Sequence, residues 1–272
     1  MDLSVTTDYE TSTGCPGPYL ERIARAGFTH VHWCHQWNTD FLYSRWEIDQ
    51  IAAWLGACGL KLLDLHASAG REKGWYSDVE YERRSGVELV TNRLEMTARL
   101  GGEVAILHVP DEPAEPAARA GYLSPVQRSL DELEPVARAC GVRLAVENGD
   151  FRTIERLLAA YPPDYLGLCY DCGHGNIAGD GLDRLEANRD RLISVHLHDN
   201  DGQGDQHRLM FTGTVDWPRL AGLLASSAYR KCVSMEVVRG QTGIDREEDF
   251  LSQAWADGSR LTGMIAGHRT AV

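Results

Sequence analysis

The chain has 272 residues and a formal net charge of −13, with 43% hydrophobic and 25% charged residues. This balance is typical of a globular protein, and no apolar run reaches the roughly 20 residues that span a membrane. The acidic charge and the lack of a basic block weigh against a nucleic-acid partner. The start lacks a basic region followed by an apolar core, so we expect no secretory signal and a cytoplasmic protein.

Apolar, strand-like segments recur along the chain with helical patterns between them. The predicted strands are 3–7, 29–35, 60–66, 104–109, 142–147, 166–171, 192–198 and 232–238. The predicted helices are 18–26, 44–59, 79–100, 125–140, 152–160, 182–188, 217–225 and 246–262. Several helical segments end on a glycine directly before the next strand, at Gly27, Gly59, Gly101 and Gly141, which is the expected C-terminal stop.

Strict alternation of strand and helix predicts a parallel sheet of the α/β class, and eight such units predict a single closed (β/α)8 TIM barrel. The competing doubly wound sheet usually has a Gly-rich phosphate turn after its first strand, and Thr7-Asp8-Tyr9-Glu10 is not such a turn. No linker or low-complexity segment is visible, so we expect residues 1–272 to form one domain. Segment 111–121, rich in alanine and proline, is predicted to be a surface loop.

Residues that commonly bind metals stand at the carboxyl ends of the predicted strands, where barrel enzymes carry their catalytic groups. They are His66, His108, Glu147, Asp171 with His174, His196 with Asp205 and His207, and Glu236. Independent core histidines and solvated carboxylates would not gather at this one register, because the opposite strand ends and the helices are equally available. Together these residues predict a metal site.

His196 and His198 are two residues apart, so in an extended strand both side chains point to the same face. A single histidine on a strand is more often a core residue with satisfied hydrogen bonds than a ligand. The group of ligand-type residues that follows favours a metal site. The strand pleat alone does not show which of the two histidines would be the ligand.

The seven cysteines form an odd set scattered through apolar segments, and we interpret them as reduced core thiols. Cys169 and Cys172 have the Cys-x-x-Cys spacing. The pair lies at a predicted strand end rather than a helix start and has no second pair, which argues against a redox or zinc-knuckle motif.

Several short motifs carry a family resemblance. They are Leu-His-Ala, Leu-His-Val-Pro, Val-Glu-Asn-Gly, Cys-Tyr-Asp-Cys-Gly-His-Gly-Asn, His-Leu-His-Asp-Asn-Asp with the later Asp-Gln-His and Gly-Thr-Val-Asp-Trp, and Ser-Met-Glu-Val. Together they resemble the xylose isomerase-like TIM barrel superfamily, and within it the sugar phosphate isomerase/epimerase (AP endonuclease family 2-like) group. The resemblance spans most of the chain but does not specify the substrate, because this scaffold carries epimerases, isomerases, dehydratases and a DNA repair enzyme.

The resemblance implies two metal layouts. In the sugar epimerases one Mn²⁺, Co²⁺ or Mg²⁺ ion is held by residues that correspond to Glu147, Asp171, His196 and Glu236. In the endonuclease-IV-like enzymes three zinc ions are held by a larger set, which adds His66, His108, His174, Asp205 and His207. The chain has a matching residue at every position of both sets, so the ligand residues alone leave both layouts open.

The resemblance also implies a reaction, the isomerisation or epimerisation of a sugar or sugar phosphate by proton abstraction next to a metal-chelated carbonyl. Glu147 and Glu236 would be catalytic and would exchange the proton on opposite faces of the substrate. His174 would contact a substrate oxygen, and His198 would lie beside the ligand His196. The reverse assignment, with His198 as the ligand, stays open.

Three other functions compete with this one. A metal-dependent dehydratase of a cyclic polyol or shikimate-type substrate would use the same enolate stabilisation but expel a hydroxyl group. A multinuclear zinc phosphoesterase would fit the larger ligand set, although the acidic chain opposes a DNA substrate. A noncatalytic sugar-binding protein on the same barrel is the third, and the intact ligand set argues against it.

Specificity is expected from the loops at the barrel mouth, which would bind a small carbohydrate. Trp33, His35 and Trp37, at the end of the second predicted strand, are candidates for stacking on a sugar face and bonding its hydroxyls, although one or both tryptophans could equally fill the barrel top. Arg239 is a candidate for an anionic or polyhydroxylated end of the substrate, with a salt bridge as its alternative. Segment 67–77 resembles a mobile lid or a solvated loop. Whether the chain forms a homo-oligomer stays open.

Overall fold

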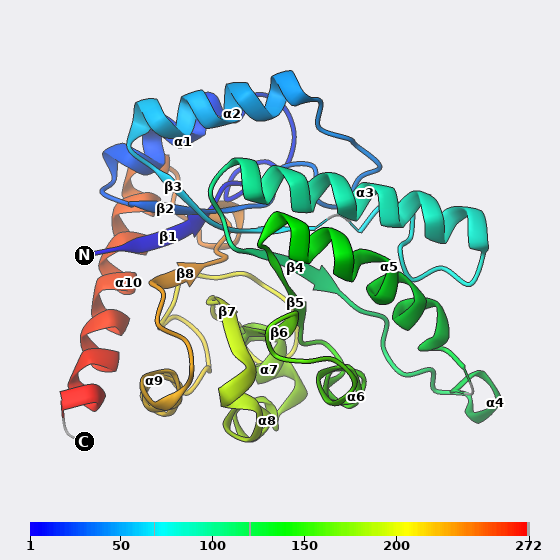
Figure 1. The fold of residues 1–272 in the computed structure, drawn as a ribbon. Coiled ribbons are helices and arrows are strands. Elements are labelled where there is room, and N and C mark those ends of the chain that lie inside the picture. Colours follow the sequence, from blue (N-terminus) through cyan, green and yellow to red (C-terminus); the bar gives the residue numbers. More distant parts are fainter. Residues whose placement is uncertain (68, 120, 271–272) are drawn as a thin grey trace.

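The computed structural model describes residues 1–67, 69–119 and 121–270. Within them the strands are β1 (Leu3–Thr6), β2 (His30–Trp33), β3 (Lys61–His66), β4 (Val104–His108), β5 (Arg143–Glu147), β6 (Leu166–Asp171), β7 (Leu192–His196) and β8 (Val233–Met235). They form one parallel sheet in the order β7-β6-β5-β4-β3-β2-β1-β8. A parallel bridge between Leu197 and Met235 joins its two edges, so the sheet curves into a nearly closed barrel (Figure 1). The predicted (β/α)8 fold is confirmed.

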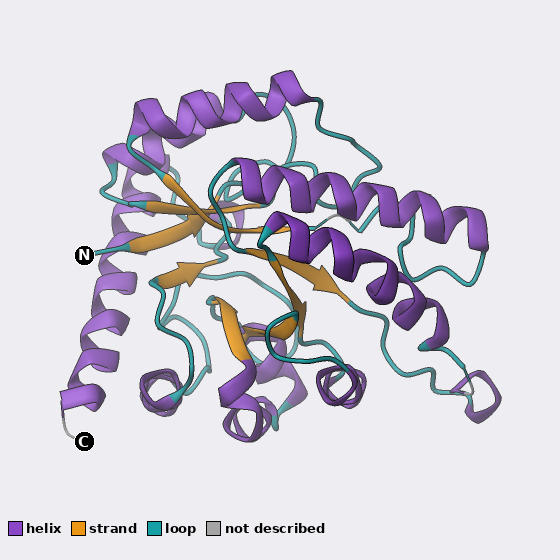
Figure 2. Cartoon of the chain, viewed as in Figure 1, coloured by secondary structure: helices purple, strands orange, loops and turns teal. Residues whose placement is uncertain are grey.

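Helices surround the strands, which lie at the centre of the molecule (Figure 2). The helices among the described residues are α1 (Gly17–Arg25), α2 (Arg45–Cys58), α3 (Glu80–Arg99), α4 (Pro116–Arg119), α5 (Ser124–Cys140), α6 (Phe151–Ala160), α7 (Cys172–Ala178), α8 (Gly181–Asn188), α9 (Trp217–Ser226) and α10 (Glu247–Thr270), with 3-10 turns η1 (Arg189–Arg191) and η2 (Arg239–Gln241). None of these helices is long and apolar enough to cross a membrane.

Local signals in the sequence explain where helices begin and end. Ser44 and Glu47 form a reciprocal capping box at the start of α2, each side chain accepting from the other residue's N–H. Gly59 and Gly141 end α2 and α5 with φ of 67° and 66°, a left-handed conformation that costs other residues free energy. These two predicted helix stops are confirmed.

The structure differs from the predicted elements in a few places. β2 and β7 end two residues early, at Trp33 and His196, because the chain leaves the sheet at the barrel mouth. Helix α7 was not predicted, since its two glycines hide the helical pattern; the side chain of Asp171 caps it by accepting from the N–H of His174 over 2.7 Å. A short helix, α4, interrupts the predicted loop and projects from the barrel (Figure 1).

All seven cysteines are free, but they are not all core thiols. Cys34, Cys169 and Cys172 are buried as predicted, whereas Cys15 is exposed because it lies in the loop before α1. The prediction that the Cys-x-x-Cys pair avoids a helix start was wrong, because Cys172 is the first residue of α7. Its thiol donates to the main-chain oxygen of His198 over 3.0 Å.

The barrel interior changes from apolar to polar along the strands. A separate buried cluster contains Val104, Ile106, Ala145, Cys169 and Ile193. Each member precedes, by two to four residues, a ligand-type residue on the same strand, so apolar side chains fill the base of the barrel and polar groups gather near its carboxyl ends.

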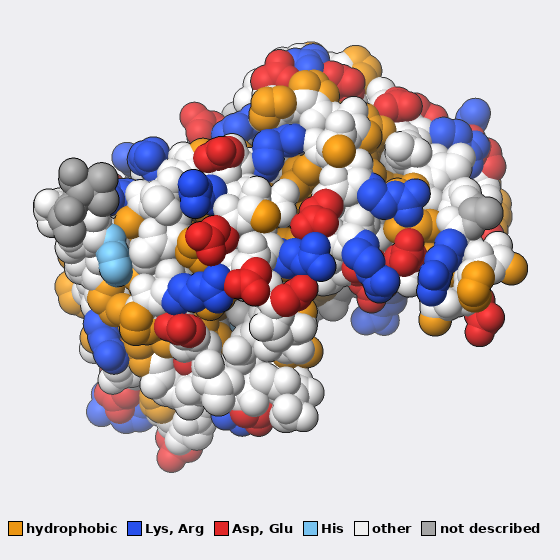
Figure 3. Space-filling model, turned by 90° about the horizontal axis from the view of Figure 1, so that it is seen from below, with side chains coloured by type: hydrophobic (Ala, Val, Ile, Leu, Met, Phe, Trp, Pro, Cys, Tyr) orange, Lys and Arg blue, Asp and Glu red, His pale blue; other side chains and the backbone are white. Residues whose placement is uncertain are grey.

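Outside the barrel, ion pairs join neighbouring helices. Arg184 of α8 lies 3.2 Å from Glu155 of α6, and Arg219 of α9 lies 3.3 Å from Glu186 of α8. Figure 3 shows the molecule from below, where Lys and Arg side chains alternate with Asp and Glu side chains. Exposed pairs of this kind contribute little to stability, so the fold rests mainly on its apolar packing.

Candidate metal centre

The ends of neighbouring strands bring four ligand-type residues together. Glu147 ends β5, Asp171 ends β6, His196 ends β7, and Glu236 directly follows β8. One donor atom from each lies within 4.8 Å of the donor atoms of the other three, and all four residues are buried. The four residues that the single-ion layout requires therefore form one cluster.

The register of the sheet explains this convergence. In the parallel pairing, Asp171 is opposite His196 and Glu147 is opposite His108. Glu236 joins them because its N–H donates to the oxygen of Leu197 over 3.2 Å, where β8 meets the end of β7. Side chains alternate along each strand, so these residues share the face that points into the barrel.

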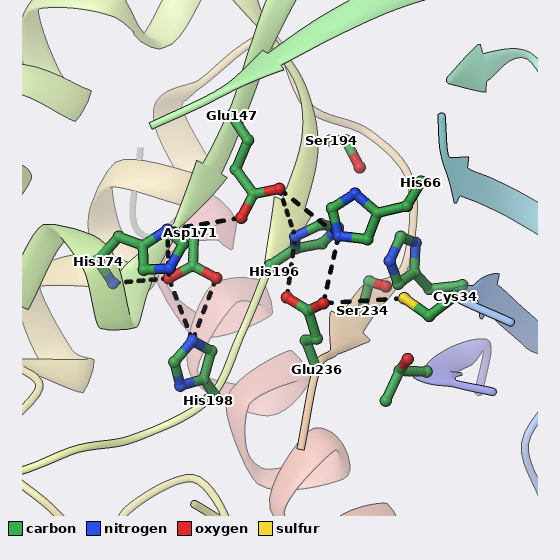
Figure 4. A network of polar contacts seen from close by, with 12 residues as sticks. Cys34, His66, Glu147, Asp171, His174, Ser194, His196, His198, Ser234 and Glu236 are labelled. Atoms are coloured by element: carbon green, nitrogen blue, oxygen red, sulfur yellow. Dashed lines mark hydrogen bonds and ion pairs between the residues drawn. The ribbon is translucent and has the colours of Figure 1, made fainter. Parts of the chain in front are cut away.

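The imidazole of His196 lies between two carboxylates (Figure 4). Its Nδ1 is 3.2 Å from Glu147 Oε2 and 3.1 Å from Glu236 Oε2. Burial would raise the pKa of both carboxyls, but the facing imidazoles outweigh burial and hold the pKa of Glu147 and Glu236 below the ordinary value. Burial would lower the pKa of His196, yet Cys169 and the two carboxylates raise it well above the ordinary value. The cluster therefore stabilises a positive charge between the two glutamates.

The cluster fits a divalent cation. Both carboxylate oxygens of Glu147 and both ring nitrogens of His196 are buried without a hydrogen-bond partner among the described residues. Leaving such a group unpaired costs about 1–3 kcal/mol, so buried polar atoms normally have partners. Carboxylate oxygens and imidazole nitrogens are common ligands of Mn²⁺, Co²⁺ and Zn²⁺, and an ion here would satisfy Glu147 and one ring nitrogen of His196.

Asp171 is fixed by its neighbours on both sides. The side-chain oxygen of Asn148 accepts from the N–H of Asp171 over 2.7 Å, and the Asn148 amide donates to the oxygen of Asp171 over 2.9 Å. Both carboxylate oxygens of Asp171 lie 3.1 Å from His198 Nε2. The two histidines of the motif thus have different contacts: His196 belongs to the four-residue cluster, and His198 lies beside it against Asp171.

A second group of ligand-type residues lies nearer to solvent. Donor atoms of His198, Asp205 and His207 fall within 4.8 Å of one another, and the rings of His198 and His207 stack 4.1 Å apart. His207 Nδ1 lies 2.8 Å from the main-chain oxygen of Glu236, which links this group to the first cluster. The loop after β7 therefore folds back over the strand ends, as its glycines allow.

Carboxylates surround His174 and His207. The charge of Asp171 and a hydrogen bond to Asp205 raise the pKa of His174 to about 11, against the opposing effect of burial. Burial would also lower the pKa of His207, but Asp205 and Glu236 outweigh it and raise the pKa to about 10. Both imidazoles therefore carry a proton at neutral pH in the metal-free chain.

His66 and His108 complete the larger set on the side of Glu147. Their Nε2 atoms lie 3.7 Å and 3.5 Å from Glu147 Oε2. The two rings stack 4.9 Å apart, and Trp37 stacks on His66 with a centroid distance of 4.9 Å. All nine predicted ligands thus lie at one end of the barrel, and Trp37 covers part of it.

Trp33 and His35 lie away from this cluster. Trp33 follows His32 on β2, so it points out of the barrel, where its Nε1 donates to the hydroxyl of Tyr43 over 3.2 Å. Both residues line a separate cavity of about 210 Å³ between β2 and α2. The expectation that Trp33 faces the barrel mouth was wrong because of strand alternation, and Trp37 occupies that place.

Arg239 lies in η2 and forms a salt bridge, which was the expected alternative to a role in substrate binding. Its Nε and Nη2 atoms donate to the two carboxylate oxygens of Glu10 over 2.5 Å and 2.7 Å. Its Nη1 donates to the main-chain oxygens of Ile244 and Asp245. The guanidinium thus ties the loop after β1 to the start of α10.

The segment expected to form a lid is anchored at several points, and Ser68 lies outside the described residues. The carboxylate of Asp40 accepts from the N–H groups of Glu72 and Lys73. Trp75 is fully buried, and its main-chain oxygen accepts from the hydroxyl of Ser129 in α5. These contacts favour a packed loop over a mobile lid.

Other residues of the site were not predicted from the sequence. They are His32, Asn148 and Cys34, whose thiol lies 3.8 Å from Glu236 Oε1. His32 could have been found by alternation, since it precedes Trp33 and must face the opposite way. The Asn148 amide had no such signal, because its role depends on Asp171, 23 residues later.

A larger hollow lies at the other end of the barrel. It has a volume of about 560 Å³ and is lined by residues that precede the strands, such as Asp2, Leu60, Gly102 and Cys232. In (β/α)8 enzymes this end contributes to stability, and the chemistry takes place at the carboxyl ends. The buried cluster of carboxylates and imidazoles is therefore the stronger candidate site.

Fold and site together define a (β/α)8 barrel with a candidate metal centre at the carboxyl ends of its strands. A profile of the xylose isomerase-like TIM barrel family matches residues 20–255, and the chain belongs to this family.

The chain is also similar to a relative in sequence and to solved structures in fold. The uncharacterized protein y4fM of Sinorhizobium fredii is 31% identical over 283 residues, which cover 92% of this chain and 89% of that protein. A D-tagatose 3-epimerase-like protein has a similar fold, with a TM-score of 0.79, 20% identity, and coverage of 100% of this chain and 99% of that one. The 3-keto-D-glucoside 4-epimerase of E. coli has a TM-score of 0.74 and 19% identity, covering 96% of this chain and 99% of that one.

Proposed function

We propose that this chain is a divalent-metal-dependent sugar or sugar phosphate isomerase or epimerase. One observation carries the proposal: two buried carboxylates, Glu147 and Glu236, face each other across His196 at 3.2 Å and 3.1 Å. Epimerisation at a carbon next to a carbonyl needs one group that removes a proton and another that returns one to the opposite face. Two carboxyl groups on either side of one small space meet this requirement when one is ionised and the other carries a proton.

The roles of the residues follow from their positions. A divalent ion held by Glu147, Asp171, His196 and Glu236 would polarise the substrate carbonyl and lower the pKa of the neighbouring C–H group. Glu147 would accept the proton from carbon. Glu236, protonated from solvent, would deliver a different proton to the opposite face, and its Oε1 lies 3.3 Å from His66 Nε2.

Residues around the cluster would bind the substrate and limit water. The main-chain oxygen of Asn148 fixes His174, whose Nδ1 lies 2.9 Å away, so the protonated ring is oriented to bind a substrate oxygen. Trp37 stacks on His66 and covers one side of the cluster. An aromatic face at this point suits the C–H groups of a sugar ring.

The substrate class follows from the fold neighbours, whose names record a tagatose 3-epimerase-like protein and a keto-glucoside 4-epimerase. Both names describe epimerisation of a carbohydrate that has a carbonyl group. We extend this class, a keto sugar with or without phosphate, to the present chain.

An activity assay tests the proposal. The protein is loaded in turn with Mn²⁺, Co²⁺, Mg²⁺ and Zn²⁺ and incubated with free and phosphorylated ketohexoses and with a 3-keto-glucoside. Chromatography of the products should show an epimer or isomer with at least one pair of metal and sugar. Glu147→Gln and Glu236→Gln should abolish it, and Glu155→Gln on the outer helix α6 should not. Product formation that survives Glu147→Gln, or no product from any sugar, would refute the proposal.

A multinuclear zinc phosphoesterase is the second candidate. It is favoured by two further groups of donors within 4.8 Å of one another, one of His66, His108 and Glu147 and the other of His198, Asp205 and His207. Three zinc ions per chain together with cleavage of a DNA duplex that contains an abasic site would support it. One ion per chain with epimerase activity would exclude it.

A further inference from the structure

His32 lies deeper in the barrel than the four-residue cluster, and neither ligand set discussed above includes it. It is fully buried on β2, and its partner in the sheet register is Asp64 of β3. His32 Nδ1 lies 2.8 Å from Asp64 Oδ1. The hydroxyl of Ser194 donates to the other carboxylate oxygen of Asp64. Asp64 is therefore held in place from two sides.

These contacts fix the protonation of the His32 ring. A carboxylate only accepts hydrogen bonds, so Nδ1 carries the proton and donates to Asp64. The other ring nitrogen, Nε2, is buried without a hydrogen-bond partner among the described residues.

The free nitrogen belongs to a set of donors. The ring centroid of His32 is 4.3 Å from that of His196 and 4.9 Å from that of His66. Donor atoms of His32, His66, His196 and Glu236 all lie within 4.8 Å of one another. A histidine that donates one N–H to a carboxylate and turns its other nitrogen toward such donors has the arrangement of a metal ligand with its supporting carboxylate.

A packing role alone does not account for this arrangement. A core histidine would be expected to have both nitrogens hydrogen-bonded, because an unpaired buried nitrogen costs about 1–3 kcal/mol. Apolar side chains fill the base of the barrel below, so an apolar residue would pack at position 32 without that cost. The hydrogen bonds of Asp64 with His32 and Ser194 instead hold the imidazole in one orientation.

We propose that His32, His66 and Glu236 hold a second divalent metal ion, deeper in the barrel than the ion bound by Glu147, Asp171 and His196. Two imidazoles and one carboxylate suit Zn²⁺ or Co²⁺ rather than Mg²⁺. The two positions share Glu236, whose Oε1 faces His66 and whose Oε2 faces His196, so the carboxylate can bridge two ions. This site is inferred from geometry and does not rest on the proposed function.

Counting metal ions tests the site without any substrate. The protein is freed of metal with a chelator, loaded with Zn²⁺, and analysed for zinc per chain by mass spectrometry. His32→Gln should bind one zinc ion fewer than the natural chain, whereas His30→Gln, two residues earlier on the same strand, should bind the same number. Asp64→Asn should weaken binding of this ion about 10–100-fold. Equal zinc content and affinity in His32→Gln and the natural chain would overturn the proposal.

Crystals of the unaltered protein provide a measurement that does not depend on a variant's folding. Anomalous scattering at the zinc edge should show a peak about 2.0–2.1 Å from His32 Nε2. A map with zinc at Glu147 and Asp171 but none at His32, or with no zinc at all, would overturn the proposal. If the zinc peak beside His32 is present but the protein has no epimerase activity, only the proposed function is refuted.

Discussion

The side-chain amide of Asn148 pairs with the main chain of Asp171 through two hydrogen bonds, of 2.7 Å and 2.9 Å. This contact locks the carboxyl end of β6 to that of β5 at the point where both strands deliver a ligand-type residue. It positions the carboxylate of Asp171 without occupying either of its oxygens.

Asn148→Ala should therefore weaken the candidate metal centre. Removing a residue that supports a metal ligand typically costs 10–100-fold in metal affinity, and we expect a loss in that range. The main-chain groups of Asp171 would also lose buried partners, at about 1–3 kcal/mol of unfolding free energy. Metal titration and urea unfolding measure the two effects. Asn188→Ala on the outer helix α8 is the control, and equal metal affinity in both variants would contradict the role given to Asn148.

Gly173 leaves room for the ring of His198. A Cβ atom at position 173 would lie 2.0 Å from His198 Cε1, in the first turn of α7. Gly173→Ala should displace His198 from Asp171 and lower the unfolding free energy by about 1–3 kcal/mol, as overpacking of a core does. Gly263→Ala in α10 is the matched control, because nothing lies within 4 Å of its added Cβ. There the change should be neutral or stabilising, since alanine favours helices. Equal effects of the two substitutions in urea unfolding would refute the close approach.

The raised pKa values of His174, about 11, and His207, about 10, predict how the metal-free protein responds to pH. Because the folded chain holds these protons more tightly, the stabilisation is complete below about pH 6.5, the ordinary pKa of histidine, and declines as pH rises through the folded values. The unfolding free energy should thus fall between about pH 7 and 10 in the presence of a chelator.

Asp205→Asn should flatten this decline, because Asp205 lies 3.4 Å from His174 and 3.0 Å from His207. Asp201→Asn, in the same loop and paired with Arg208, should leave the slope unchanged. Urea unfolding at a series of pH values measures both variants. A stability that rises over this range, or the same slope in both variants, would show that these histidines are not protonated in the folded chain.

The pairing of Arg239 with Glu10 predicts a structural role for this arginine. The pair is partly exposed, so Arg239→Ala and Glu10→Gln should each reduce the unfolding free energy only slightly. The double variant should cost less than the sum of the two, as expected for residues in contact. The KM for a sugar substrate should change by less than about twofold in either variant. A much higher KM in Arg239→Ala but not in Glu10→Gln would assign Arg239 to substrate binding instead.

Much of the fold was predictable, because each strand and most helices have local signals. Alternating segments predicted the strands, and glycines such as Gly59 and Gly141 predicted where helices end. The convergence of the ligand-type residues followed from the same argument, since the carboxyl ends of parallel strands meet at one end of a barrel.

What the sequence did not predict depends on register and on distant contacts. His196 and His198 both face the ligand-type residues, but the sequence did not predict that His196 lies between Glu147 and Glu236 while His198 contacts Asp171. The contact between Arg239 and Glu10 joins residues 229 positions apart. His32 was not predicted as a site residue, although side-chain alternation along β2 places it inside the barrel and Trp33 outside.

Incorporation of solvent deuterium tests most directly whether Glu147 and Glu236 transfer a proton at carbon. The metal-loaded protein is incubated in D₂O with a keto sugar that it converts, and the product is examined by NMR. We predict deuterium at the carbon whose configuration changes, and none when Glu147→Gln replaces the natural chain. A product that keeps the original hydrogen at that carbon, or deuterium incorporation that persists in Glu147→Gln, would contradict the account.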